Sequence, residues 1–293
     1  MSAVALTDVT YEVAVGGHGP AILFLHGFTG SGAEWGPFLA ALAPAHTTVT
    51  VDLLGHGATS RPTDPARYAL VHQSADLAQI LGRLDIGSAI VVGYSYGARI
   101  ALQLAVDHPA RIAGLILESP SAGIADPDER AARRAADEAF AGDLERDGIE
   151  AFADRWEAMP MFAGERRLPD PVRGELARRR RANDPLALAA ALRGAGQGAM
   201  TPLHDRLAAI SVPTGILAGS TDPVGLARAQ VVATAIPGAT MEVLDGVGHA
   251  PHRQAPDRFA AWLGRAIDGI ESASAPSDPS PVLVPSPQRR SAQ

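Results

Sequence analysis

Short, nearly continuous apolar runs alternate along the chain with longer segments in which apolar residues recur at helical spacing. The runs cover residues 21–26, 47–52, 89–93, 112–118, 214–219 and 240–244. Their continuity is typical of parallel strands that are buried on both faces. The helical patterns cover residues 35–42, 71–84, 96–108, 226–236 and 257–270. This alternation predicts an α/β fold, with a mostly parallel central sheet flanked by helices.

The alternation stops between residues 121 and 206, where apolar residues keep helical spacing and no strand run appears. We predict a helical cap at 121–206, inserted into a core formed by residues 1–120 and 207–271. The cap holds 14 of the 25 arginines and 16 acidic residues, so we expect most of its charge to be paired on solvated helix faces. Half of residues 272–293 are Ser or Pro, which predicts a disordered tail.

Composition narrows the classes of function. The 293 residues suffice for a sizeable core, and 46% hydrophobic with 19% charged residues is an ordinary globular profile. A net charge of −7 offers no footprint for nucleic acid. We find no basic leader and no apolar stretch long enough to span a membrane, and we expect a soluble cytoplasmic protein. The lack of Cys and Lys excludes a thiol nucleophile and a lysine Schiff base.

One motif carries nucleophile chemistry. The segment Gly93-Tyr94-Ser95-Tyr96-Gly97 matches G-x-S-x-G and lies between a predicted strand and a predicted helix. In that context the serine occupies a strained strand-to-helix turn, where a Cβ at either flanking position would crowd the strand or the helix. We therefore predict that Ser95 is the nucleophile.

A serine hydroxyl needs a histidine and an orienting carboxylate, which we expect later in the chain in the order acid, then histidine. Asp222 follows the fifth predicted strand and His249 follows the sixth. Open α/β sheets place their sites in such loops, at the carboxyl ends of the strands. We predict a triad of Ser95, Asp222 and His249, with Glu118 and Asp245 as competing acids.

The remaining polar groups of these loops have simpler roles. The backbone amides of Phe28 and Tyr96 are the natural pair for an oxyanion hole. We expect His26 and His56 to form structural hydrogen bonds within their loops. The nine histidines show no metal-ligand spacing, and no G-x-G-x-x-G follows a strand. We expect neither a metal nor another cofactor.

Five segments together resemble the landmarks of the α/β-hydrolase fold, from residue 21 to about 270: HGF, DLLGHG, GYSYG, GSTD and GVGHAPH. Within that fold the chain resembles the 2-succinyl-6-hydroxy-2,4-cyclohexadiene-1-carboxylate (SHCHC) synthases of menaquinone biosynthesis. The matching segments are LHGFTGSGAEW, GYSYGAR, ESPSAGI with the following ERAAR, FADRWEAMPMF and RRRRANDP. The family commonly has Met or Leu, then Gly, Gly and Arg after GYS. The Tyr96 and Ala98 of this chain depart from that pattern, which predicts a narrower pocket.

The resemblance implies a lyase that removes a proton from its substrate and expels pyruvate. It implies that His249 and Asp222 activate the Ser95 oxygen as a base, while the oxyanion hole stabilises charge on the succinyl carbonyl of the substrate. The substrate is a small molecule with several carboxylates, which the guanidinium fork of arginine suits. The sequence gives no oligomeric state.

Arg99 is where the resemblance and the residues agree. It lies one turn after Ser95 on the same helix face, and a cation in the first turn of a helix opposes the macrodipole unless an anion compensates. By motif matching, the family's other carboxylate-binding positions fall on Arg133 and Arg180. The pocket walls fall on Tyr94 and Trp156. Arg178, Arg179 and Arg181 adjoin Arg180 and compete for its place.

Two other functions remain open. A serine hydrolase of small esters, or of carbon–carbon bonds in ring-cleavage products, would use the same three residues with water as second reactant. A non-catalytic receptor on the same scaffold is a different class, since a fold does not fix a function. The intact triad favours catalysis, and the cap separates the lyase from the hydrolase.

Overall fold

Eight strands form one sheet in the computed structural model, which describes residues 2–274. The strand order is β1-β2-β4-β3-β5-β6-β7-β8, and every pair from β4 to β8 is parallel. Six strands fall on the predicted apolar runs: β3 (Ala21–Leu25), β4 (Thr47–Val51), β5 (Ala89–Tyr94), β6 (Ile112–Glu118), β7 (Thr214–Gly219) and β8 (Thr240–Leu244). The predicted α/β class is confirmed.

The first two strands were not predicted from the sequence. β1 (Ser2–Ala5) and β2 (Thr10–Gly17) pair antiparallel, and β2 also pairs antiparallel with β4. Along β2 the burial alternates, with Tyr11 and Val13 fully buried between more exposed neighbours. An edge hairpin with one covered face does not produce the continuous apolar run by which the other strands were found.

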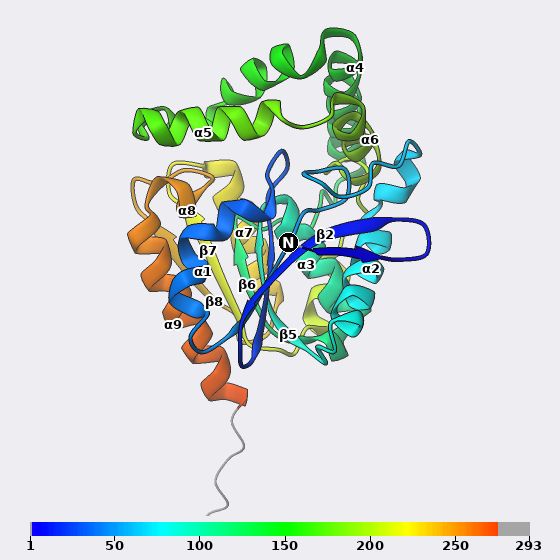
Figure 1. The fold of residues 1–293 in the computed structure, drawn as a ribbon. Helices are drawn as coiled ribbons and strands as arrows, with labels where there is room; N and C mark the ends of the chain where they lie inside the picture. The colour runs from blue at the N-terminus through cyan, green and yellow to red at the C-terminus, as the bar shows by residue number, and fades with distance from the viewer. Residues whose placement is uncertain (1, 275–293) are drawn as a thin grey trace, which may run out of the picture.

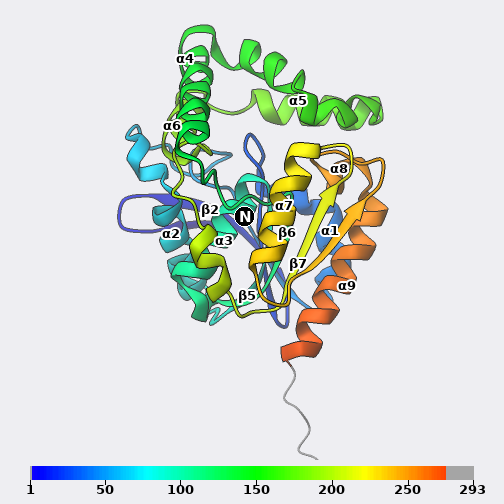
Figure 2. The same ribbon diagram turned by 180° about the vertical axis from the view of Figure 1, so that it is seen from behind.

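Helices cover both faces of the sheet (Figures 1 and 2). The larger core packs one face against α2 (Leu70–Arg83), α3 (Tyr96–Asp107) and α7 (Pro223–Ala235). The other face packs against α1 (Gly36–Leu42) and α9 (Pro256–Ser274). The short helices are η1 (Gly32–Trp35), η2 (Pro65–Tyr68), η3 (Pro109–Arg111), η5 (His204–Ala209) and α8 (Pro251–Gln254).

The end of α9 corrects one predicted boundary. The helix continues to Ser274, so the first residues of the predicted disordered tail are helical. The Ser272 hydroxyl donates to the Asp268 carbonyl at 2.7 Å, a bond that a serine can make inside a helix. The rest of the predicted tail, residues 275–293, lies outside the described residues.

The segment between β6 and β7 is helical and lies over the carboxyl ends of the parallel strands (Figure 1). It comprises α4 (Pro127–Glu157), η4 (Pro160–Arg167), α5 (Asp170–Arg181) and α6 (Pro185–Ala195). α4 is interrupted at Gly148, whose φ of 76° glycine adopts without strain. A separate apolar cluster that includes Leu144, Phe152 and Trp156 forms the inside of this cap.

The turn from β5 into α3 brings backbone atoms of neighbouring elements into close contact. Ser95 has φ 50° and ψ −99°, outside the regions that a residue with a side chain normally adopts. A Cβ on Gly97 would lie 2.3 Å from the carbonyl oxygen of Leu25, and one on Gly93 would lie 2.7 Å from the Cα of Ala98. The glycines therefore let α3 rest directly against β3 and β5 and hold the serine turn in place.

This contact generates the first prediction. Gly97→Ala should lower the free energy of unfolding by at least about 2 kcal/mol, because the backbone atoms it meets cannot move aside as a flexible side chain would. Gly264→Ala, in the interior of α9, is the matched control, since nothing lies within 4 Å of its added Cβ. There alanine should add up to about 1 kcal/mol of stability through helix propensity. Urea unfolding measures both. Equal effects would show that the close contact at Gly97 carries no stability.

Candidate active site

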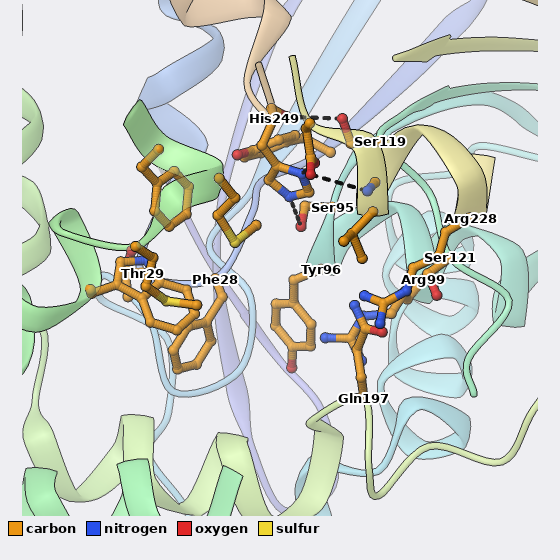
Figure 3. A pocket seen from close by; sticks show the side chains of 18 of the residues that line it. Phe28, Thr29, Ser95, Tyr96, Arg99, Ser119, Ser121, Gln197, Arg228 and His249 are labelled. Atoms are coloured by element: carbon orange, nitrogen blue, oxygen red, sulfur yellow. Dashed lines mark hydrogen bonds and ion pairs between the residues drawn. The ribbon is translucent and has the colours of Figure 1, made fainter. Parts of the chain in front are cut away.

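Ser95, His249 and Asp222 meet at the carboxyl edge of the sheet (Figure 3). Ser95 ends the β5 turn, Asp222 caps the start of α7, and His249 lies in the loop after β8. His249 Nε2 lies 2.9 Å from Ser95 Oγ, and His249 Nδ1 lies 2.6 Å from Asp222 Oδ2. With Nδ1–H donated to the carboxylate, Nε2 is left to accept the serine proton.

The environment of Asp222 keeps it ionised. Burial alone would raise its pKa, but the hydrogen bond and charge of His249 and the Gly225 amide at 3.1 Å hold the pKa below its usual value. The two competing acids have other partners. Glu118 accepts from the backbone amide and the Nδ1 of His252, both at 2.9 Å, and Asp245 accepts from Ser220 at 3.0 Å. Of the three acids considered, Asp222 is the one bonded to His249.

The two predicted oxyanion residues face the same cavity. Tyr96 is the first residue of α3, where a backbone N–H has no partner within the helix. Phe28 lies in the loop after β3, and its ring centroid is 6.2 Å from that of Tyr96. Both residues line the pocket that contains Ser95 and His249.

Two buried histidines hold the loops around Phe28. His26 Nε2 accepts the Leu53 amide at 2.9 Å, and His56 Nε2 accepts the Thr29 amide at 3.2 Å. Burial lowers the pKa of His56 to about 3, so the ring is neutral, as an acceptor must be. These contacts agree with the structural roles expected for both histidines.

The pocket has a volume of about 370 Å³ and lies between the sheet edge and the cap. One wall is aromatic and includes the predicted Tyr94 and Trp156 together with Phe28 and Phe162. Tyr94 lies against His249, with ring centroids 5.6 Å apart, and Trp156 lies 5.3 Å from Phe28. The cap therefore contributes an apolar wall to the pocket around Ser95.

Arg99 and Arg133 also line the pocket. Arg99 is buried; its guanidinium donates to the Ala195 carbonyl at 2.6 Å and lies 5.2 Å from the Tyr96 ring centroid. Burial lowers the pKa of Arg99 to about 10, which still leaves a cation at neutral pH. Arg133 is one-third exposed and bonds Asp137 through Nε at 2.8 Å.

Arg180 is the member of its arginine run that is buried and lines the pocket. It also pairs with Glu165 at 2.6 Å and Glu157 at 3.5 Å, so the predicted contact with a substrate carboxylate would be made by an arginine that already has acidic partners. Its neighbours are paired on the surface of α5, Arg178 and Arg179 with Glu175 and Arg181 with Glu150, Asp154 and Glu157.

Arg180 belongs to a buried ionic chain that ties the cap to the core. Arg253 of α8 lies 2.8 Å from Glu34 of η1 and 2.8 Å from Glu165 of η4, and Glu165 in turn pairs with Arg180. Burial alone would raise the pKa of both glutamates, but the adjacent Arg253 holds both pKa values below the usual range. The chain crosses from the sheet layer to the cap beside the active site.

The sequence analysis missed Arg228, which lines the pocket from α7 beside Arg99 (Figure 3). One signal could have found it: Arg228 is the one charged residue of α7 and lies on the second turn after the Asp222 cap. Within residues 2–274 no group of side chains is arranged to hold a metal ion. None of the described helices is long and apolar enough to cross a membrane.

Comparison with known proteins identifies the family. A family model described as alpha/beta hydrolase fold matches residues 20–256. The SHCHC synthase of Klebsiella pneumoniae subsp. pneumoniae is 32% identical over 249 residues, 85% of this chain and 94% of its own length. The chain belongs to the α/β-hydrolase family and, within it, to the SHCHC synthases.

Further matches agree with this assignment. A Bacillus subtilis protein with the provisional name of SHCHC synthase is 35% identical over 261 residues, 88% of this chain and 95% of its own. The solved structure of MenH from S. aureus matches with a TM-score of 0.84 at 31% identity, over 89% of this chain and 98% of that one. Est816, an N-acyl homoserine lactone degrading enzyme, matches with a TM-score of 0.75 at 28% identity, over 90% and 99% of the two chains.

The ionic chain generates a pH-dependent prediction. Arg253→Gln should lower the free energy of unfolding by about 3–5 kcal/mol at pH 7, because Glu34 and Glu165 stay buried and both lose their ion pair with Arg253. In the parent the lowered pKa values give stability that is present above the ordinary carboxyl pKa, near 4.3, and is lost below it. In the variant Glu165 keeps Arg180 and Glu34 keeps His252, but without Arg253 burial raises both pKa values from their level in the parent. The deficit should therefore shrink as the pH falls from 8 to 5.

Urea unfolding at several pH values tests this. Arg265→Gln removes an exposed arginine paired with Glu242 at 2.9 Å and should cost less than about 1 kcal/mol at each pH. A deficit of Arg253→Gln that stays constant between pH 8 and 5 would contradict the account.

Proposed function

We propose that this chain catalyses the SHCHC synthase reaction, the elimination of pyruvate from 2-succinyl-5-enolpyruvyl-6-hydroxy-3-cyclohexene-1-carboxylate, with Ser95, His249 and Asp222 as its catalytic residues. The observation that carries the proposal is the presence, in one enclosed pocket, of a hydrogen-bonded Ser–His–Asp set and a buried cation, Arg99, that bonds no carboxylate among the described residues. A neutral ester gives no reason to bury that charge.

The chemistry requires a base more than a nucleophile. The hydrogen on ring carbon 2 lies between the succinyl carbonyl and the ring double bond, and both acidify it. Its removal shifts the double bond to carbons 2 and 3, forms a second one between carbons 4 and 5, and breaks the bond from carbon 5 to the enolpyruvyl oxygen. The leaving enolpyruvate takes up a proton and becomes pyruvate, so no water is consumed.

The three residues divide this proton transfer among them. Ser95 Oγ, already bonded to His249 Nε2, takes the carbon-bound proton as its own proton moves onto the imidazole. Asp222 stabilises the imidazolium through Nδ1. His249 can then return a proton toward the departing enolpyruvate. The amides of Phe28 and Tyr96 would hold the oxygen of the succinyl carbonyl as negative charge moves onto it.

The arginines supply recognition. The substrate carries a succinyl, a ring and an enolpyruvyl carboxylate, and a carboxylate in an apolar pocket needs a charge-assisted partner. Arg99 and Arg133 face that pocket from α3 and α4. Arg180, already balanced by Glu165, positions the cap wall beside Phe162, whose ring centroid lies 5.3 Å from its guanidinium.

The hydrolase alternative uses the same three residues but makes a different demand on the pocket. Neutral esters would gain nothing from the arginines, so the charge of the pocket separates the two reactions. A receptor without turnover would not need the hydrogen bond from Ser95 to His249.

The deciding experiment offers the purified protein the enolpyruvyl substrate beside a panel of neutral esters and measures pyruvate. We expect pyruvate release from the parent and its loss, by several orders of magnitude, in Ser95→Ala, His249→Ala and Asp222→Asn. These losses should not add in double variants, because the three groups act as one unit. Strong ester turnover without pyruvate would establish the hydrolase instead. Full activity of Asp222→Asn with loss in Glu118→Gln would move the acid to Glu118.

The arginines give a second kinetic prediction. Arg99→Ala should lower kcat/KM for the carboxylated substrate by about 30- to 150-fold, the worth of a charged hydrogen bond of roughly 2–3 kcal/mol. Lysine should rescue only part, because an ammonium lacks the bidentate fork. Arg133→Ala should behave like Arg99→Ala.

Two controls separate recognition from stability. Arg146→Ala, whose exposed side chain pairs with Asp143 and Asp147, should be near neutral. Arg180→Ala should lower thermal stability and impair every substrate alike, because it breaks the buried pair with Glu165. Equal losses on the carboxylated substrate and a neutral ester in Arg99→Ala would mean that Arg99 supports the fold and does not bind a carboxylate.

A further inference from the structure

The pocket holds more positive charge than its own acids neutralise. Five arginines line it, and three of them bond carboxylates: Arg133 with Asp137, Arg180 with Glu165 and Glu157, and Arg253 with Glu34 and Glu165. Within residues 2–274, Arg99 and Arg228 have no ion pair. The one acid that lines the pocket, Asp222, is already bonded to His249 and Gly225.

Arg228 has even fewer partners than Arg99. Arg99 at least donates to a backbone carbonyl, whereas the Arg228 guanidinium makes no hydrogen bond to any described residue. Its side chain is nevertheless partly buried in the pocket wall, on the second turn of α7. An arginine that stabilised a loop would donate hydrogen bonds to it. A structural role therefore does not explain why Arg228 has no hydrogen-bond partner in the described part of the chain.

The surroundings of Arg228 disfavour its charged form. Burial and the nearby Arg133 both lower its pKa, and Asp222 and Glu129 offset them only in part. Arg99 in turn feels the positive charges of both Arg133 and Arg228. Arg99 and Arg228 lie at one end of the cavity, next to Ser121 and Gln197, which can also donate hydrogen bonds (Figure 3), and Arg133 lines the same pocket. An anion placed among them would relieve the repulsion.

We propose that Arg228 is a substrate-binding residue, which together with Arg99 forms a dicarboxylate site on the α7 side of the pocket. Two arginines without acidic partners can bind two carboxylates of one ligand. A carboxylate beside Arg228 and Arg133 would balance positive charge that the described acids of the protein do not neutralise. This deepens the proposed function and rests on it for the identity of the substrate, but the binding chemistry stands without it.

The position of Arg228 also ties recognition to catalysis. It lies on the same helix that Asp222 caps, so a carboxylate held by Arg228 is anchored to the element that orients His249. The bound end of the substrate is thereby fixed relative to the base. Loss of this anchor should weaken binding and leave the proton-transfer groups in place.

The test compares Arg228→Gln, Arg228→Lys, Arg99→Gln and the charge-matched control Arg265→Gln. Calorimetric titration with succinate, and with dimethyl succinate as neutral counterpart, measures binding without any turnover. We expect the succinate Kd to rise roughly 10- to 150-fold in Arg228→Gln, the range for one charged hydrogen-bond partner, with partial rescue by Lys and no change in the control. Dimethyl succinate should bind all variants equally poorly.

Stability provides a second readout that a merely structural role would not reproduce. Unliganded Arg228→Gln should melt at or above the temperature of the parent, because it removes an unpaired cation from a cationic wall. Kinetics with the enolpyruvyl substrate should show a higher KM with kcat largely kept.

The outcomes separate this inference from the proposed function. Loss of succinate binding in Arg228→Gln with no pyruvate from the parent would keep the dicarboxylate site and reject the synthase. Pyruvate release with unchanged KM and succinate Kd in Arg228→Gln would keep the synthase and overturn the inference. A parent that does not bind succinate, or an Arg228→Gln variant that melts well below it, would also overturn the inference.

Discussion

The strained turn at Ser95, between β5 and α3, is the constraint on which the site depends. Because Gly97 lets α3 approach the carbonyl of Leu25, the chain can reverse from β5 into the helix with a serine at φ 50°. That single turn sets three groups at once. It raises Ser95 Oγ at the sheet edge, places the Tyr96 amide at the free start of α3, and aims Arg99, one turn further, into the same cavity. The strain of the turn is tolerated because the strands and helix around it are buried.

Asp222 and His249 reach this point because parallel strands end at one edge. Asp222 and His249 follow β7 and β8, two strands that lie beyond β6 in the sheet. Asp222 serves twice, as the cap of α7 and as the partner of His249, so the helix start and the imidazole are fixed by one carboxylate. The orientation of the base therefore follows from the fold and needs no further device.

The arginines that line the pocket fall into two groups, those that pair with buried acidic residues and those that have no acidic partner among the described residues. The arginines with buried glutamate partners, Arg253 and Arg180, join the cap to the core, and those partners balance their charges. Those without acidic partners, Arg99 and Arg228, remain in the pocket at a cost to stability that a bound anion would offset. The proposed recognition relies on these two cations together with Arg133, which also pairs with Asp137.

Sequence reasoning succeeded where the physics is local or periodic. Six strands were found from their apolar runs, which reflect burial on both faces in all of them except the edge strand β8. Ser95, Asp222 and His249 were selected because each follows one of these strands. The β1–β2 hairpin was not predicted, because only one of its faces is covered and its sequence has no continuous apolar run. The pairing of Arg180 with Glu165 and the exposure of Arg228 to the pocket depend on how the cap and α7 pack, which spacing along the chain does not encode.

A crystal structure of Ser95→Ala soaked with the enolpyruvyl substrate would show whether the pocket presents a carbon acid to Ser95 while its arginines hold the carboxylates. We expect substrate carboxylates on the guanidinium groups of the pocket and ring carbon 2 facing the vacated Oγ position, within reach of His249 Nε2. A substrate with its carboxylates toward solvent, or with an ester-like carbonyl carbon at the serine position, would contradict it.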